Sequence, residues 1–150
     1  MLRSSLLALC LLAPLVPTRA IAQSGEDRDG VRRAALDYIE GFYEGDAAKL
    51  RRSVRPEVTK FGFSKERGAA QYAGQPMSFE QMIAYAERVK SSGRGGPPAG
   101  APKEVNLLDV QDQTAAAKVV AWWGTDYLHL AKYEGRWMIV HVIWQSPPPV

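Results

Sequence analysis

Residues 114–145 constrain the fold of this chain more than any other segment, because they form three apolar runs separated by two turn signals. The segment reads TAAAKVVAWWGTDYLHLAKYEGRWMIVHVIWQ. The pairs Gly124-Thr125 and Glu134-Gly135 are typical of two-residue hairpin turns, in which glycine supplies the backbone freedom. The pattern therefore predicts three antiparallel strands. Both faces of their sheet are apolar, so both faces must be covered.

The N-terminus has the pattern of an export signal rather than of a folded segment. A short positive start precedes an apolar run from Leu6 to Val16, and Ala20-Ile21-Ala22 supplies the small-x-small pattern of a cleavage site. A run of about a dozen residues is too short to span a bilayer. The alternative, a buried N-terminal helix, is disfavoured by Pro14 and Pro17. We expect residues 1–22 to be a signal peptide and the mature protein to be periplasmic or secreted, without membrane attachment.

Cysteine usage and charge exclude several classes of site. The only cysteine, Cys10, lies inside the expected signal and follows Leu9 instead of the small residue of a lipoprotein signal. The mature chain is therefore without disulfides, thiol nucleophiles and cysteine-type zinc sites. Removing Arg3 and Arg19 from the 19 basic residues leaves 17 against 16 acidic residues, a net charge of +1. That balance does not support nucleic-acid binding.

Two helices are predicted in the first third of the mature chain. Residues 23–28 are polar and are expected to be a disordered lead-in. From residue 31 to residue 43, apolar side chains recur at spacings of three and four, with Asp29 placed as the N-cap. Gly45 is placed to end this helix. Asp46 is then placed to cap a second, shorter helix.

A third helix and two further strands complete the predicted elements. Ser78 begins the helix, and Gln81 is placed to complete a capping box. The alternating segment at 58–63 and the segment at 104–110 read as strands. The stretch SSGRGGPPAGAP at 91–102 reads as a flexible linker rather than a functional lid.

Helices followed by antiparallel strands predict a single α+β domain, which we place at residues 29–146, before a Pro-rich tail at 147–150. GFYEGDAAKLRRSVRPEV resembles the first helical pair of the nuclear transport factor 2-like superfamily. TDYLHLAKYEGRWMIVHVIW is similar to the closing hairpin of its putative lumazine-binding subfamily. The resemblance implies a cone-shaped, cystatin-like fold, in which three N-terminal helices pack on a curved antiparallel sheet and leave a pocket. Members of the superfamily include enzymes and proteins that only bind or dimerise.

Counting outward from the two turns assigns the strand residues to two faces. In this register Trp123 lies opposite Asp126, and Leu128 lies beside Ala121 and His141. One face is rich in small and aliphatic residues, and we expect it to pack against the helices. That face holds Ala117, Val119, Ala121, Asp126, Leu128, Leu130, Trp137, Ile139, His141 and Ile143. A slip of one residue would exchange the faces, and a β-bulge would exchange them locally.

The opposite face is aromatic, and its apolar area exceeds what a soluble monomer usually exposes. We therefore predict a homodimer, because aromatic side chains bury a large area with little loss of entropy. The predicted interface comprises Trp122, Tyr127, His129, Met138, Val140 and Trp144. The alternative is a monomer in which lysines and loops cover this face.

The cavity of the predicted cone is expected to bind a small, partly aromatic ligand. Its expected lining is Tyr38, Phe42, Phe61, Leu128, Trp137 and His141. The resemblance suggests lumazine, although no set of residues specifies a pteridine. We expect no cofactor and no metal site, because the two histidines face opposite sides in the predicted register and an HExxH motif is absent.

The alternative function is an enzyme of the same fold, a dehydratase or an isomerase-like proton-transfer enzyme, with His141, Asp126 and Tyr38 as candidate catalytic residues. Asp126 and His141 lie diagonally on neighbouring predicted strands, within side-chain reach, so that Asp126 could orient His141 as a general base. In isomerases of the resembled superfamily a tyrosine on the first helix binds the oxyanion, and Tyr38 has that place. Those isomerases also need an aspartate on the first strand, where this chain has Phe61-Gly62-Phe63. We favour a non-catalytic binding protein, since a core histidine and a turn-stabilising aspartate also explain the pair.

Overall fold

The computed structural model of this chain describes the backbone of residues 20–148 and the side chains of residues 25–148. Apart from its last three positions, the expected signal peptide at 1–22 lies outside the described residues. Across the described part of the chain, none of the helices combines the length and the apolar character that crossing a bilayer requires.

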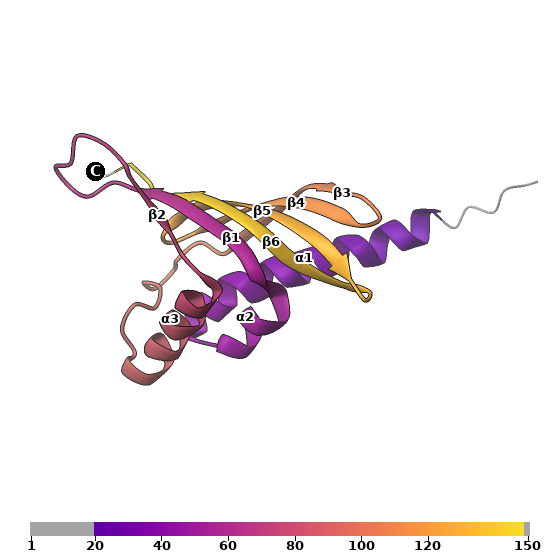
Figure 1. Cartoon of the computed structure of the whole chain (residues 1–150), viewed down its shortest axis with the longest axis horizontal. Coiled ribbons are helices and arrows are strands. Elements are labelled where there is room, and N and C mark those ends of the chain that lie inside the picture. Colours follow the sequence, from indigo (N-terminus) through magenta and orange to yellow (C-terminus); the bar gives the residue numbers. More distant parts are fainter. Residues whose placement is uncertain (1–19, 149–150) are drawn as a thin grey trace, which may run out of the picture.

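Three helices pack against one face of a six-stranded sheet, which confirms the predicted α+β class (Figure 1). The helices are α1 (Ala20–Glu44), α2 (Ala47–Ser53) and α3 (Phe79–Ser92). The sheet has the order β2-β1-β6-β5-β4-β3. The strands are β1 (Val54–Ser64), β2 (Ala73–Pro76), β3 (Glu104–Val110), β4 (Thr114–Ala121), β5 (Gly124–Tyr133) and β6 (Arg136–Gln145). Helix α1 runs beneath the sheet, and α2 and α3 lie toward one end of it.

The sheet is mixed rather than antiparallel throughout, which corrects the sequence prediction. Strand β1 runs parallel to β6, with Lys60 opposite Val142, and the other neighbours are antiparallel. A parallel pair cannot be joined by a tight hairpin. Here the connection between the two strands includes α3 and four intervening strands of the same sheet. The first strand of the chain therefore lies beside the last one.

The helix ends follow the local signals in the sequence. The side chain of Asp46 accepts hydrogen bonds of 2.9 and 3.2 Å from two backbone N–H groups in the first turn of α2. Ser78 and Gln81 form the predicted capping box at the start of α3. Gly45 ends α1 with a φ of 68°. A Cβ at Gly45 would lie 2.5 Å from the backbone nitrogen of Lys90, so glycine also permits the close approach of α3.

Helix α1 begins before the expected N-cap at Asp29, and residues 23–28, expected to be disordered, are helical. Asp27 accepts a hydrogen bond of 3.0 Å from Trp137 Nε1 and forms an ion pair of 2.5 Å with Lys132. These two partners lie on β6 and β5. The part of α1 around Asp27 is therefore held by the sheet, which explains why the polar sequence at 23–28 is helical.

One hydrophobic core lies between the helices and the concave face of the sheet. It includes Val31 and Ile39 of α1, together with Leu128 and Leu130 of β5, all of which are at most 1% exposed. The predicted inward orientation of Leu128 is thus confirmed. Alternation along β5 places the intervening residues on the outer face.

The turn between β4 and β5 lies at Trp122-Trp123 rather than at Gly124-Thr125. Asp126 pairs with Val119 instead of the predicted Trp123. This difference of four residues is even, so the residues of β4 keep their predicted face. Gly124 has a different role, because a Cβ there would lie 2.0 Å from the carbonyl oxygen of Gln145. Glycine is required at position 124 by the close approach of β6 and not by the turn.

The second hairpin forms as predicted around Glu134-Gly135. These residues have φ values of 50° and 77°, as a two-residue turn of this kind requires. Tyr133 pairs with Arg136 across the turn. The register of the first four pairs of this hairpin is therefore that expected from the sequence.

A β-bulge at Val140 then shifts the pairing of β5 with β6. Leu130 pairs with Ile139, whereas the preceding residue His129 pairs with His141. Val140 is the extra residue on β6 between these pairs. Such an insertion of one residue changes which side of the sheet the following residues face.

Beyond the bulge, the two faces of β6 are exchanged relative to the prediction. Val142 is fully buried, and Ile143, expected inside, is 42% exposed. His141 lies on the outer face with His129, while Trp144 points toward the helices. The placement of His141 in the cavity and the placement of Trp144 in the outer interface are both corrected by this bulge.

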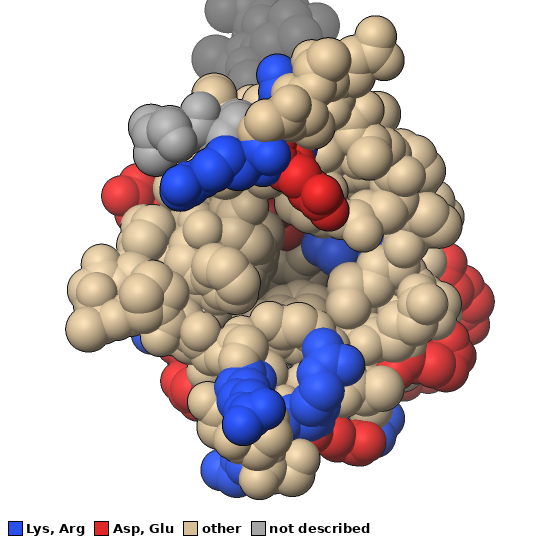
Figure 2. All heavy atoms as spheres, turned by 90° about the vertical axis from the view of Figure 1, so that its left-hand side faces the viewer, with Lys and Arg blue, Asp and Glu red and all other residues tan. Residues whose placement is uncertain are grey.

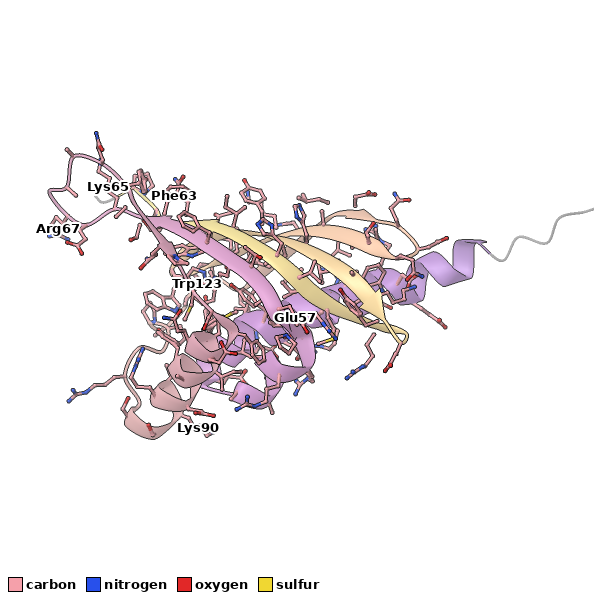
Figure 3. The ribbon with its side chains drawn as sticks, viewed as in Figure 1. Glu57, Phe63, Lys65, Arg67, Lys90 and Trp123 are labelled. Carbon is pink, nitrogen blue, oxygen red and sulfur yellow. The ribbon has the colours of Figure 1, made fainter. Side chains whose placement is uncertain are left out.

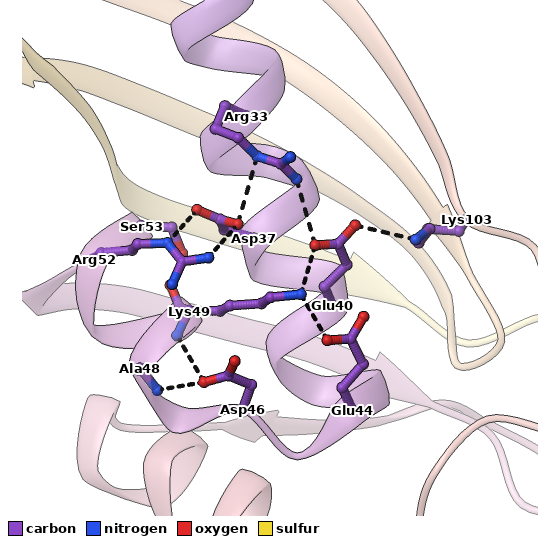
Figure 4. A network of polar contacts seen from close by, with 10 residues as sticks. All are labelled: Arg33, Asp37, Glu40, Glu44, Asp46, Ala48, Lys49, Arg52, Ser53 and Lys103. Atoms are coloured by element: carbon purple, nitrogen blue, oxygen red, sulfur yellow. Dashed lines mark hydrogen bonds and ion pairs between the residues drawn. The ribbon is translucent and has the colours of Figure 1, made fainter.

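A network of ion pairs joins α1 to α2 and to the segment before β3 (Figure 4). Glu40 lies 2.8 Å from Lys49 and 3.1 Å from Lys103. Asp37 accepts two hydrogen bonds from Arg52, at 2.7 and 2.8 Å. The side chains of Asp37 and Glu40 are 6% and 15% exposed, so these pairs are only weakly screened by water.

We expect Glu40→Gln to lower the free energy of unfolding at neutral pH by about 2 kcal/mol. Burial opposes ionisation of Glu40, but the hydrogen bonds and charges of Lys49 and Lys103 lower its pKa from 4.5 to about 2. A carboxylate whose folded-state pKa is depressed stabilises the fold above its unfolded pKa, and this stabilisation disappears as pH falls through the folded value. The difference between variant and wild type should therefore shrink as pH falls from 5 toward 2.

Urea unfolding across this pH range measures the effect, with Glu66→Gln on an exposed loop as the matched control. An equal loss of stability at every pH would show that the charge of Glu40 is not responsible.

Candidate functional site

An aromatic cavity of about 200 Å³ lies between the concave face of the sheet and α3. Side chains from α1, β1, β6, α3 and the β4–β5 turn surround it. Its lining is Phe42, Lys60, Met77, Tyr85, Trp122, Trp123 and Trp144. Figure 2 shows a hollow at this end of the molecule, bordered mainly by uncharged residues, with basic side-chain atoms inside. The volume is below that of most drug-sized pockets, so the cavity suits a small ligand.

A larger groove of about 760 Å³ lies between α1, α2 and the β5–β6 hairpin. Its lining is strongly charged, and most of these side chains already pair with one another. Trp137, expected to line the ligand cavity, lies in this groove, where it donates its hydrogen bond to Asp27. The smaller aromatic cavity is the better candidate site, because its lining holds one charged side chain instead of a network of ion pairs.

Three polar side chains meet at the inner end of the aromatic cavity. The hydroxyl of Tyr38 donates a hydrogen bond of 2.6 Å to Asp126 Oδ2. Lys60 Nζ donates one of 2.5 Å to the Tyr38 oxygen and lies 3.4 Å from Asp126 Oδ2. Trp123 Nε1 donates a bond of 2.7 Å to Asp126 Oδ1. Within residues 25–148, every buried side-chain nitrogen or oxygen has a hydrogen-bond partner.

Strand alternation brings the charged members of this cluster together. On β1, Val58 and Lys60 face inward while Thr59 and Phe61 face outward. On β5, Asp126 shares the inward face with the core residue Leu128. The helical face of α1 that buries Ile39 also buries Tyr38. Three separate elements therefore place one polar group each at the same buried point.

Burial determines the ionisation of two of these groups. The Lys60 side chain is 4% exposed, and that of Asp126 is 0% exposed. Burial lowers the pKa of Lys60, and the attraction of Asp126 offsets this effect only in part. Burial, together with the adjacent Asp126 carboxylate, raises the pKa of Tyr38 well above its usual range. The phenol of Tyr38 therefore stays protonated, whereas the amine of Lys60 loses its proton more readily than an exposed lysine.

Aromatic rings surround the amine of Lys60. Its Nζ lies 5.3 Å from the ring centre of Tyr38, 5.8 Å from that of Phe42 and 5.6 Å from that of Trp144. Ring faces attract a cation at such distances. The cavity thus combines flat apolar walls with a single amine, a combination that can hold an aromatic ring and bind a polar group on it.

The position of Trp144 in the wall depends on Gly62. The two residues pair on β1 and β6. A Cβ on residue 62 would lie 1.8 Å from the indole nitrogen of Trp144. Glycine therefore leaves the space that the indole ring occupies.

The expected cavity lining is only partly brought together. Phe42 lines the cavity, and Tyr38 belongs to the polar cluster at its inner end. Leu128 is buried in the general core instead. Phe61 is 37% exposed and faces away from the helices, since the alternation of β1 turns Lys60 inward. His141 lies on the outer face, because the bulge at Val140 reverses the orientation of the residues that follow it.

Only some of the residues expected at the dimer interface lie on the outer face of the sheet. Tyr127 and His129 are exposed on the outer face, and Met138 is 5% exposed. Trp122 lines the cavity, together with Trp144. Figure 3 shows the contrast between the two sides of the sheet, with Trp123 toward the helices and Phe63 near the opposite surface. Val140 is the partly buried bulge residue.

Of the three candidate catalytic residues, the structure joins two. Tyr38 and Asp126 are hydrogen-bonded, but His141 stacks on His129 with ring centres 5.2 Å apart. The expectation that the two histidines face opposite sides is wrong, because the bulge turns His141 toward His129. Residues 25–148 contain no cluster of three or more His, Cys, Asp or Glu side chains arranged to hold a metal ion.

Lys60 is the charged residue of the site that sequence reasoning missed, and Met77, Tyr85 and Trp123 are lining residues that it also missed. The signal for Lys60 is slight, a lysine at an inward position of the alternating segment VTKFGF. Lysine in a strand is ordinarily exposed, because burial of its charge requires a partner. That partner, Asp126, lies 66 residues later.

Comparison with known families gives a match over most of the chain. The sequence model of a family described as "Putative lumazine-binding" matches residues 26–145. No curated protein matches the sequence.

Solved structures show the same fold at low sequence identity. An NTF2-like protein of unknown function from Silicibacter pomeroyi has a TM-score of 0.62 and 18% identity, over 83% of this chain and 98% of that protein. Another, from Methylobacillus flagellatus, has a TM-score of 0.62 and 20% identity, over 82% and 94% of the two chains. A putative scytalone dehydratase from Novosphingobium aromaticivorans has a TM-score of 0.58 and 10% identity, over 85% and 88%. At these identities the similarity concerns the fold alone.

We expect Asp126→Asn to lower the free energy of unfolding by about 3 kcal/mol, because it leaves Lys60 as an uncompensated buried charge. Adding Lys60→Met to this variant should recover part of the loss, since the remaining charge is then removed. Denaturant unfolding of the single and double variants measures both effects. Asp112→Asn, in an exposed turn, is the matched control. A cost for Asp126→Asn no greater than for Asp112→Asn would show that the pair is not a buried charge pair.

Proposed function

Because the chain belongs to the putative lumazine-binding family of nuclear transport factor 2-like proteins, we propose that it binds a small, partly aromatic molecule in the cavity around Lys60. The observation that carries this proposal is the lining itself. Five of its seven residues are aromatic, and Lys60 is the charged one among them. Stacking on indole and phenyl faces would hold a flat ring.

Lys60 supplies the polar part of the proposed recognition. Its Nζ donates to Tyr38, and an ammonium group has three hydrogen-bond donors. A ligand oxygen that enters the cavity can accept a further hydrogen bond from this amine. The proposed ligand is therefore a small ring system with an acceptor oxygen, and a pteridine dione such as lumazine is one compound with those features.

We also propose that the protein is exported and acts as a binding protein rather than an enzyme. The positive start, apolar run and Ala20-Ile21-Ala22 pattern support the export. With His141 on the outer face, the expected histidine base is missing from the cavity, which favours binding over catalysis.

The enzymatic alternative retains one supporting observation. Tyr38, Lys60 and Asp126 form a continuous hydrogen-bonded chain beside the cavity, and such chains can move protons. Recovery of a bound ligand without chemical change would favour the binding protein. Conversion of the ligand would favour an enzyme that uses these three residues instead of His141.

We propose in addition that the outer face of the sheet pairs two copies of the chain. Phe61, Ile143 and Tyr127 are neighbours across β1, β6 and β5, and they are 37%, 42% and 48% exposed. An apolar row of this kind on a soluble protein is typical of an interaction surface. Of the interface residues predicted from the sequence, the proposed interface retains Tyr127 and His129. It also includes Phe61, His141 and Ile143. Trp122 and Trp144 are not part of it, because they line the cavity.

Ligand binding is expected to raise the melting temperature of residues 23–150 and to quench tryptophan fluorescence, because a bound ligand stabilises the native state and three indoles line the cavity. Lumazine and indole-3-carboxaldehyde are suitable first compounds. Trp144→Ala should weaken binding about tenfold or more, since it removes one wall of the cavity. Tyr127→Ala, on the outer face, is the matched control and should bind as the wild type does. Equal affinity of both variants would exclude this cavity.

The dimer is expected to be visible by analytical ultracentrifugation at micromolar concentration. Tyr127→Glu should shift the species to a monomer, because it places a charge at the centre of an apolar contact. Ala84→Glu, on the exposed side of α3, is the control and should leave the dimer intact. A wild-type monomer at these concentrations would contradict the proposed pairing.

A further inference from the structure

The charge balance around Lys60 restricts the ligands that its cavity can accept. Among the residues that line the cavity, Lys60 carries the only charge, and the Asp126 carboxylate already lies 3.4 Å from its Nζ. An anionic ligand would add a second negative charge at a point where both existing side chains are at most 4% exposed. An unpaired buried charge is strongly unfavourable. An uncharged ligand with a polar oxygen leaves the balance unchanged.

The Lys60 amine is placed where it can react covalently with an uncharged ligand that carries a carbonyl oxygen. A nucleophilic lysine needs a desolvated site, a group that exchanges its proton, and a neighbour that stabilises the charged product. Lys60 has each of these. It lies among three aromatic rings, its Nζ is hydrogen-bonded to the Tyr38 hydroxyl at 2.5 Å, and the Asp126 carboxylate accepts from that hydroxyl at 2.6 Å.

We propose that Lys60 condenses reversibly with a small aromatic aldehyde or ketone, so that the ligand is held in the cavity as an imine. This inference rests on the proposed small-molecule function and names the ligand class. Burial also makes the free amine more accessible at neutral pH, because it lowers the pKa of Lys60.

The reaction balances without an added oxidant or reductant. The free amine attacks the carbonyl carbon, a C–N bond forms, and the carbonyl oxygen takes up the proton that Lys60 released. The nitrogen then gives up a second proton to this hydroxyl, which leaves as water as the C–O bond breaks, and the nitrogen lone pair forms the C=N bond. A protonated amine and a neutral carbonyl compound thus give a protonated imine and one water.

The surrounding groups suit each stage of this reaction. Tyr38 bridges Lys60 and Asp126 and so connects the amine to a carboxylate that can share the moving proton. The protonated imine carries the same charge as the original ammonium group. It therefore keeps its attraction to Asp126 and to the ring faces of Phe42 and Trp144. The aromatic part of the ligand fills the space between the tryptophans.

Reductive trapping tests the proposal. Residues 23–150 are incubated with benzaldehyde and sodium cyanoborohydride, which converts an imine to a stable benzyl amine, and the labelled lysines are located by peptide mass spectrometry. At pH 7 we expect Lys60 to be labelled several times faster than Lys118, since burial lowers the pKa of Lys60 and so increases its fraction of free amine. The pH at which the rate is half-maximal should lie below the roughly 10.4 of a free lysine.

Matched variants and a ligand without a carbonyl group complete the design. Lys118→Met, on β4, should leave the labelling of Lys60 unchanged, and Lys60→Met should abolish the fast phase. Benzyl alcohol should compete with benzaldehyde and slow the labelling, because it has the same ring. If Lys60→Met does not fold, the site of labelling in the wild-type protein still decides the question.

The outcomes separate this inference from the proposed function. If benzyl alcohol or lumazine binds in the cavity but Lys60 is labelled no faster than Lys118, the imine is refuted and the binding function stands. If no ring compound binds and Lys60 is not preferentially labelled, the proposed function fails, and the imine fails with it. Fast, saturable labelling confined to Lys60 supports both.

Discussion

The buried charge pair of Lys60 and Asp126 is the interaction on which the site depends. Moving two ions out of water costs several kcal/mol for each, and the cost is recovered only if all their hydrogen bonds are made. Here Tyr38 of α1 and Trp123 of the β4–β5 turn provide the remaining bonds. The helix, two strands and the turn must therefore reach their positions together, which couples the geometry of the cavity to the folding of the whole domain.

This coupling gives the same residues two duties. Trp123 satisfies Asp126 and also lines the cavity, while Lys60 completes the charge pair and faces the space available to a ligand. A core without these polar groups would often be as stable or more so, because apolar replacements of buried ion pairs are frequently neutral or stabilising. Keeping them in an aromatic pocket is typical of a functional site, where stability is commonly sacrificed for activity.

The elements that the sequence predicts well depend on neighbouring residues. Asp46 and the pair Ser78–Gln81 act within one helical turn, and their caps are where local chemistry places them. The four strands of the C-terminal half follow from their alternation, and Gly135 marks the turn between the last two. The parallel pairing of β1 with β6 joins segments about eighty residues apart, and no local pattern specifies such a pairing.

The candidate site was less predictable because it depends on distant partners and on one inserted residue. The bulge at Val140 exchanges His141 and Trp144 between the faces of β6, and a count from the turn cannot detect it. Lys60 has no neighbour in sequence that marks it as buried, since Tyr38 and Asp126 lie on other elements. Tyr38 and Asp126 themselves were identified, but without the amine that links them to the cavity.

The extra residue at Val140 makes the end of β6 tolerant of a one-residue deletion. Deleting that one residue would remove the bulge, but Ile139 and His141 would keep their partners Leu130 and His129, so Trp144 would stay in the cavity wall. This strand therefore has one spare residue, whose loss the ladder absorbs without altering the wall around Lys60.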